Sequence, residues 1–411
     1  MLAALHLIDP RPDLLSGLSD ADWGAALDFA DRSQLTLALR RASCDRMPGW
    51  VRERTDRDAA HNLERLRTAE ELYRFLADRL AGIPFLALKG LTHTPDFGSA
   101  PADRPQYDID LFTPREHVET ARDALLACRY ESIEGMERFP TDHIPALIRK
   151  TGWEWRGDFF DPEMPLAVEL HFQFWSPALE RLRAPGVEEF WDRRIARRIA
   201  GADLAVLSAY DALGYAALHL LRHVLRGSAR PFHVFEIACF LAARGNDGAF
   251  WRDWRGLHSP ALRRLEAVAF RLAAEWFGCP LGEAAGEVER LPAATEAWFS
   301  EFATSPATRV FRPSKDELWL HISLLDSRRD AWSVARRRLL PTSLPRPVDA
   351  VHIPGRDMQW IRRLLRGARY AAYLVSRAGY HAAALPLALH GGVRWLWRVR
   401  QVNMAAIGRS S

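Results

Sequence analysis

The 411-residue sequence contains only four cysteines, and no two of them form a C-x-x-C pair. This excludes a disulfide-rich scaffold and a zinc ribbon, and it is typical of proteins from a reducing compartment. A long apolar run is also missing, because the longest uncharged stretch, 378–393, is interrupted by two histidines, a proline and paired glycines. That stretch is too short and too broken to cross a bilayer. With no basic, apolar leader after Met1, these absences predict a cytoplasmic protein.

Lysine is scarce as well, since Lys89, Lys150 and Lys315 are the only three and the remaining positive charge is arginine. A lysine at a special position is therefore more informative here than in an average sequence. The formal net charge of +4 is mild and does not by itself indicate a nucleic-acid partner. Hydrophobic residues make up 48% of the chain and charged residues 26%, as in soluble globular proteins.

Four stretches of the chain differ in pattern. Apolar residues recur every three or four positions over 63–80, which predicts an amphipathic helix ending before Gly82 and Pro84. We expect an N-terminal helical segment at 1–80, a mixed core at 81–180, a helical domain at 181–340 and a basic, aromatic helical tail at 341–411. Four prolines at 341–354 predict a linker or an extended segment at the start of the tail.

The mixed core is predicted to hold several short strands. Apolar or alternating runs at 83–88, 107–112 and 167–174, and a further one around 153–160, are typical of strands. The residues Thr113-Pro114-Arg115-Glu116 have the composition of a capping box, which predicts that a helix begins at Thr113. From about 187 to 340 the pattern predicts helices.

Two carboxylates lie close together on the predicted strand at 107–112. Side chains at i and i+2 of a strand point to the same face, so Asp108 and Asp110 lie side by side while Ile109 and Leu111 enter the core. Two like charges this close repel each other, and a divalent cation is the usual relief. The alternative is an ordinary edge strand with a solvated outer face.

A second alternating strand, 167–174, places Glu169, His171 and Gln173 on one face. Such a face can be solvated, which is the simpler interpretation. The alternative is a functional role for Glu169 and His171.

Three motifs together resemble the signature of an uncharacterised bacterial nucleotidyltransferase-like family within the polymerase-β-type nucleotidyltransferase superfamily. These motifs are Leu88-Lys89-Gly90, Arg104-Pro105-x-x-Asp108-Ile109-Asp110-Leu111 and Val168-Glu169-Leu170-His171. The resemblance covers roughly residues 60–245. It implies an α+β fold in which a small mixed sheet of about five strands is embedded in N- and C-terminal helices.

The resemblance also implies roles for individual residues. Asp108, Asp110 and Glu169 match the three acids that hold the metals and carry catalysis, with Glu169 completing the second metal site or acting as base. The cofactor-binding positions would be Lys89, Gly90, Arg104 and His171. Gly90 matches a turn that lets a triphosphate approach the backbone, while lysine and arginine suit phosphate oxygens.

The implied function is transfer of NMP from an NTP to an acceptor with loss of pyrophosphate, dependent on Mg²⁺ or Mn²⁺. A peptide, small molecule or sugar is the favoured acceptor. Two alternatives remain open. One is an RNA-modifying nucleotidyltransferase that uses the basic tail, and the other is a non-catalytic binding module on the same fold.

Two further features have more than one interpretation. His219 and His223 are one helical turn apart, but no further zinc ligands can be identified, so we expect a histidine pair near the nucleotide. From Arg356 onward, ten arginines and several aromatic residues accompany the single acid Asp357. This tail can contact RNA or, peripherally, an anionic membrane, or it can form amphipathic helices that wrap the catalytic unit. We favour wrapping helices, because the apolar positions are dense.

Overall fold

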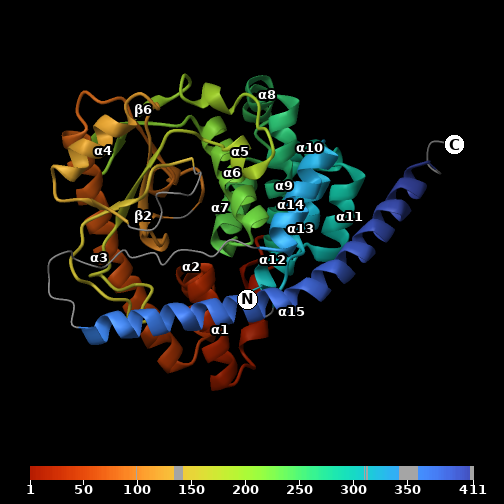
Figure 1. Ribbon diagram of the computed structural model, residues 1–411, viewed down its shortest axis with the longest axis horizontal. Coiled ribbons are helices and arrows are strands. Elements are labelled where there is room, and N and C mark those ends of the chain that lie inside the picture. The colour runs from red at the N-terminus through yellow and green to blue at the C-terminus, as the bar shows by residue number, and fades with distance from the viewer. Residues whose placement is uncertain (99, 134–141, 310, 312, 342–359, 408–411) are drawn as a thin grey trace.

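The computed structural model describes residues 1–98, 100–133, 142–309, 311, 313–341 and 360–407, and its elements are labelled in Figure 1. The linker predicted at 341–354 lies outside the described residues except for Pro341. Short 3₁₀ helices are η1 (Leu2–Leu5), η2 (Pro12–Leu15), η3 (Cys44–Arg46), η4 (Gly90–His93), η5 (Pro101–Asp103), η6 (Val187–Phe190) and η7 (Gly282–Ala284).

The N-terminal segment is helical, as predicted. It contains α1 (Asp20–Ser33), α2 (Thr36–Ser43) and the long α3 (Gly49–Arg79). The apolar stripe predicted at 63–80 falls on the C-terminal half of α3, where Tyr73 and Leu76 are buried, although Leu63 is exposed. Leu80 closes the helix, and Gly82 follows with a positive φ of 83°.

A seven-stranded mixed sheet follows, in the order β3-β4-β5-β2-β1-β7-β6. Its strands are β1 (Leu86–Leu88), β2 (Asp108–Phe112), β3 (Glu131–Ser132), β4 (Leu147–Ile148), β5 (Ala167–His171), β6 (Ile195–Ile199) and β7 (Ala202–Val206). Strand β2 runs parallel to β5 and antiparallel to β1. The predicted α+β fold with a mixed sheet among helices is confirmed, but the sheet is larger than the five strands expected.

The β6–β7 hairpin was not predicted, because 187–340 was expected to be helical. Strand β6 lies at the sheet edge and most of its residues are partly or fully exposed, so it lacks the apolar alternation of a half-buried strand. The sheet therefore continues beyond residue 180. The domain boundaries at 80, 180 and 340 stay predictions.

Two local predictions are wrong. Helix α4 (Val118–Leu126) begins after His117, and Thr113 is not its cap. The Thr113 backbone N–H instead donates to the His171 carbonyl at 2.8 Å, so Thr113 extends the pairing of β2 with β5. The strand around 153–160 is absent, because this segment turns at Gly157, which has a φ of 89°.

The sheet separates two apolar cores. Ala87, Ile109 and Leu111 pack in one core with α3 and α4, whereas Leu86 and Leu88 pack on the other face with the helical domain. The short α5 (Pro177–Glu180) follows β5. The helices of the helical domain are α6 (Ala209–Arg226), α7 (Pro231–Arg244), α8 (Gly248–Leu257), α9 (Pro260–Phe277), α10 (Ala285–Glu289), α11 (Ala293–Phe302), α12 (Ser305–Thr308), α13 (Glu317–Ser323) and α14 (Arg328–Leu339). The face of β2 opposite Ile109 therefore looks toward α6 and α7 (Figure 1).

The described part of the tail beyond Pro341 forms one helix, α15 (Trp360–Ile407), which passes α13 and α11 and extends beyond the body (Figure 1). Ala384, Ala388 and Trp395 are buried. The expectation that its dense apolar positions are buried is wrong for others, including Val393 and Met404, which are largely exposed. Among the described residues, no helix is both long and apolar enough to cross a membrane.

Candidate active site

Pairing between three central strands brings the sequence-predicted acids together. In β2, Ile109 and Leu111 enter the core with α3 and α4, so Asp108 and Asp110 face the opposite side. Asp110 lies opposite Glu169 of β5 in the parallel pair and opposite Leu88 of β1 in the antiparallel pair. All three predicted acids consequently line one cavity of about 290 Å³ between the sheet and α6 and α7.

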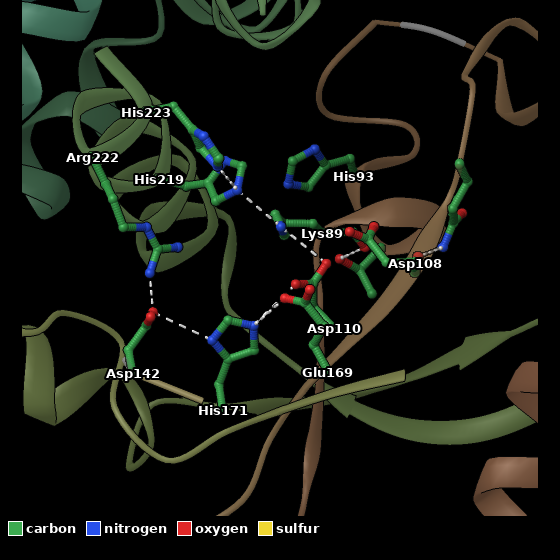
Figure 2. A network of polar contacts seen from close by, with 12 residues as sticks. Lys89, His93, Asp108, Asp110, Asp142, Glu169, His171, His219, Arg222 and His223 are labelled. Atoms are coloured by element: carbon green, nitrogen blue, oxygen red, sulfur yellow. Dashed lines mark hydrogen bonds and ion pairs between the residues drawn. The ribbon is translucent and has the colours of Figure 1, made fainter. Parts of the chain in front are cut away.

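Asp110, Glu169 and His171 form the tightest polar group of the cavity. Their ligand atoms lie within 4.8 Å of one another, a spacing that one metal ion can bridge. His171 Nε2 is 3.0 Å from Asp110 Oδ1 and 3.5 Å from Glu169 Oε2 (Figure 2). His171 is buried, so the simpler interpretation of a solvated strand face does not hold for it.

Asp108 lines the same cavity but stands outside that tight group. Burial and the adjacent Asp110 carboxylate raise the pKa of Asp108 to about 6. Burial acts on Asp110 in the same direction, but Lys89 and His171 outweigh it and hold the pKa of Asp110 below its usual range. The Asp110 carboxylate is therefore well stabilised in its ionised form, whereas the negative charge of the neighbouring Asp108 is poorly compensated.

Glu169 and His171 each change the pKa of the other. Burial alone would raise the pKa of Glu169, but hydrogen bonding to His171 lowers it. Burial alone would lower the pKa of His171, yet its contacts with Asp110 and Glu169 raise it. At neutral pH these shifts favour an imidazolium between two carboxylates.

Lys89 is a buried partner of this acidic group. Its Nζ lies 2.9 Å from Asp110 Oδ2 and 3.0 Å from His219 Nε2, and its side chain is only 12% exposed. A surface lysine that merely ends a strand is therefore not what the structure shows. Its backbone adopts φ 48° and ψ −155°, a region that non-glycine residues rarely occupy and that costs about 1–3 kcal/mol.

Gly90 continues this turn with a φ of 57°. A Cβ at Gly90 would lie 2.7 Å from Gln106 Nε2 and 2.8 Å from Tyr73 Oη. Both the backbone conformation and the space thus require glycine. The predicted close approach of a triphosphate to this turn stays a prediction, because the nearby side chains account for the glycine by themselves.

Arg104 reaches the cavity, where it is already paired. Its Nε donates to Glu236 Oε1 at 2.9 Å, and His93 Nδ1 contacts the same oxygen at 3.1 Å. Burial would raise the pKa of Glu236, but Arg104 and His93 hold it well below its usual range. The structure therefore places Arg104 in a buried ion pair at the cavity wall.

The histidine pair of α6 lines the cavity, and its expected place near the nucleotide stays a prediction. His223 Nε2 lies 3.1 Å from His219 Nε2, and the His233 ring stands 4.8 Å from the His219 ring between centroids. Burial lowers the pKa of each, with Lys89 a further cause at His219, so these rings are neutral. Within the part of the chain that the structure describes, the pair belongs to no group spaced to hold a metal.

Sequence reasoning missed the outer part of this network. Asp142 accepts from Arg222 Nη1 and lies 3.3 Å from His171 Nδ1 (Figure 2). Arg222 is three residues after His219, so a helical projection of α6 could have placed both on one face. Asp142 gave no such signal, because its partners are 29 and 80 residues away along the chain.

The charges around the cavity are closely balanced. Five acidic residues and five lysines or arginines line it, together with six histidines. Burial lowers the pKa of the α6 and α7 histidines, so these rings add little positive charge to the cavity wall.

Comparison with known proteins identifies a single family. Residues 19–278 match the model of a family described as uncharacterised nucleotidyltransferase, and this span includes every residue that lines the cavity. No match was found among proteins of curated function or among solved structures.

Proposed function

The chain belongs to the uncharacterised nucleotidyltransferase family, and from this premise we propose that it moves NMP from an NTP to an acceptor and releases pyrophosphate. In this reaction an acceptor oxygen forms a bond to the α-phosphorus, while the bond from that phosphorus to the pyrophosphate oxygen breaks. The acceptor's proton passes to a base in the cavity. The convergence of Asp108, Asp110 and Glu169 on one cavity is the observation that carries the proposal.

The donor set fits a hard divalent cation. Carboxylate oxygens are the ligands that Mg²⁺ prefers, and the raised pKa of Asp108 indicates negative charge that the protein alone does not compensate. We propose that Asp108, Asp110 and Glu169 hold Mg²⁺, with His171 fixing the Asp110 carboxylate. When bound, the metal neutralises charge that develops on the phosphates.

The protein's own residues would bind and orient the reactants. Glu169 has a lowered pKa and is ionised at neutral pH, so it can serve as base or complete a second metal site. Lys89 contacts the carboxylate that a metal would also use, and we expect it to exchange Asp110 for a phosphate oxygen when the nucleotide binds. Arg230, which is exposed at the cavity lining, is placed to meet the outer phosphates.

We propose a peptide or small molecule as the acceptor. Every residue that lines the cavity lies between Gln34 and Glu236, and the basic helix α15 contacts α11 and α13 instead. Because α15 does not line the cavity, an RNA acceptor bound to α15 would have to extend from that helix to the cavity. This arrangement favours an acceptor that enters the cavity itself.

Calorimetry of NTP binding, with Mg²⁺ and with EDTA, tests the proposal. The variant Asp110→Asn removes a proposed ligand, and Asp123→Asn on α4, 64% exposed, is the matched control. We expect Mg²⁺-dependent binding in wild type and the control, with at least about a tenfold loss in Asp110→Asn. Incubation with α-³²P-labelled NTPs and pooled peptides or metabolites should then transfer label and release pyrophosphate. NTP affinity that is indifferent both to EDTA and to Asp110→Asn would overturn the proposal.

A further inference from the structure

Helix α15 carries an apolar face that is exposed among the described residues. Six large apolar side chains fall within an arc of roughly 100° at 3.6 residues per turn. These residues are Trp360, Leu364, Val375, Val393, Trp397 and Met404, and each is between 58% and 73% exposed. Over 48 residues the helix is about 70 Å long at ~1.5 Å per residue.

The opposite face of α15 is fixed to the body, so this apolar face is held outward. Trp395 is buried, and its Nε1 donates to the Ala294 carbonyl of α11 at 2.8 Å. Trp319 of α13 donates to the Ala388 carbonyl at 3.0 Å, and its ring stacks on Trp395. Turning the apolar face inward would break these contacts.

The charge of α15 indicates what covers the face. Between Trp360 and Ile407 the sequence has eight arginines and no aspartate, glutamate or lysine; Arg394 and Arg398 pair with Glu301 of α11, which leaves α15 positively charged. A second copy of the chain would bring the same positive charge against it, which opposes pairing of two α15 faces. RNA would satisfy the arginines but would leave the leucine, valine and methionine side chains in water.

We propose that α15 docks the protein on an anionic lipid surface. The helix lies along the interface with its apolar face among the acyl chains and its arginines at the headgroups, where tryptophan is also favoured. In this proposal α15 does not cross the membrane, and none of the described helices is long and apolar enough to do so. This inference goes beyond the proposed nucleotidyl transfer and does not rest on it.

Flotation of the full-length protein with lipid vesicles tests the proposal. We expect binding to phosphatidylcholine vesicles that contain about 30% phosphatidylglycerol, with little binding to phosphatidylcholine alone and weakening at high salt. The variant Val375→Ser/Val393→Ser/Trp397→Ser should lower the affinity at least about tenfold. Ile195→Ser is the matched control, because Ile195 is 46% exposed on β6, which Figure 1 places on the far side of the molecule from α15.

A charge-reversal variant tests the contribution of the arginines. Arg369 is exposed and lies outside the apolar arc, and Arg369→Glu should weaken binding to anionic vesicles without changing the circular dichroism spectrum or the melting temperature. Equal binding of wild type to neutral and anionic vesicles, or no binding to either, would overturn the proposal. So would concentration-dependent dimers that the apolar triple variant abolishes, because the face would then bind a second copy.

Discussion

Two substitutions on strand β2, Asp108→Asn and Asp110→Asn, test the charge argument for the site. Each removes one carboxylate at nearly constant volume, and both side chains line the same cavity. In metal-free protein at pH 8 we expect opposite effects. Asp108→Asn should raise the free energy of unfolding, and Asp110→Asn should lower it.

The expected gain follows from the pKa of Asp108, which burial and Asp110 raise from 3.8 to about 6. A carboxyl with a raised folded-state pKa costs stability as pH rises, because the unfolded chain releases its proton first. The penalty is absent below pH 3.8 and complete above about pH 6. At ~1.36 kcal/mol per pKa unit the full penalty is about 3 kcal/mol, which is the upper bound on what asparagine gains.

The expected loss follows from the partners of Asp110. Lys89 Nζ at 2.9 Å and His171 Nε2 at 3.0 Å both contact its carboxylate, and all three side chains are mostly buried. Asp110→Asn leaves the mostly buried Lys89 and His171 side chains without that carboxylate. Breaking a buried ion pair from one side typically costs ~3–5 kcal/mol.

Urea denaturation in EDTA at pH 5 and pH 8 measures both effects, with Asp123→Asn as the exposed-carboxylate control. The gain of Asp108→Asn should be smaller at pH 5, where wild-type Asp108 still holds much of its proton. If Asp108→Asn destabilises the protein at pH 8 as Asp110→Asn does, Asp108 is a partner in a structural ion pair. The charge argument for a metal at this site would then fail.

Three further predictions concern single side chains. Gly90→Ala should destabilise by about 1–3 kcal/mol in urea denaturation, and by more than Gly157→Ala, which shares a positive φ but has no atom within 4 Å of its added Cβ. Lys89→Met should weaken NTP binding by about 1–3 kcal/mol in calorimetry and NMP binding less; equal losses would remove Lys89 from the phosphate site. His258, whose two carboxylate partners outweigh burial and raise its pKa to about 9, contributes stability below pH 6.5 that is lost as pH rises through about 9. His258→Gln should therefore flatten the stability profile between these pH values by about 3 kcal/mol, and an unchanged profile would refute this assignment.

Local pattern in the sequence predicts the elements that face a core. Tyr73 and Leu76 on α3 and the apolar side of β2 repeat with the helix and strand periods, so their elements were recognised. Strand β6 was missed because an edge strand with little buried surface has no such period. Thr113 was wrongly predicted to cap a helix. Its backbone N–H donates to the His171 carbonyl instead, a partner that only the folded sheet supplies.

The residues of the candidate site were also predicted only in part. Asp108 and Asp110 were found from their spacing in one strand, and Glu169 from a second strand and a family resemblance. The placement of Asp142 beside His171 and Arg222 depends on how a loop and α6 pack against β5, and no local spacing encodes it. The mutual pKa shifts of the cavity residues likewise arise only when the strands pair.

We propose that separate parts of this chain carry catalysis and membrane contact. The family match at 19–278 contains the whole cavity wall, from Gln34 to Glu236, whereas α15 begins at Trp360 and packs on α11 and α13. A helix that lies on a lipid surface without lining the cavity changes the concentration of acceptor that the site meets, but not the chemistry of the site. Loss of the apolar face of α15 should therefore leave transfer to a water-soluble acceptor intact and slow transfer only to an acceptor that is itself membrane-bound.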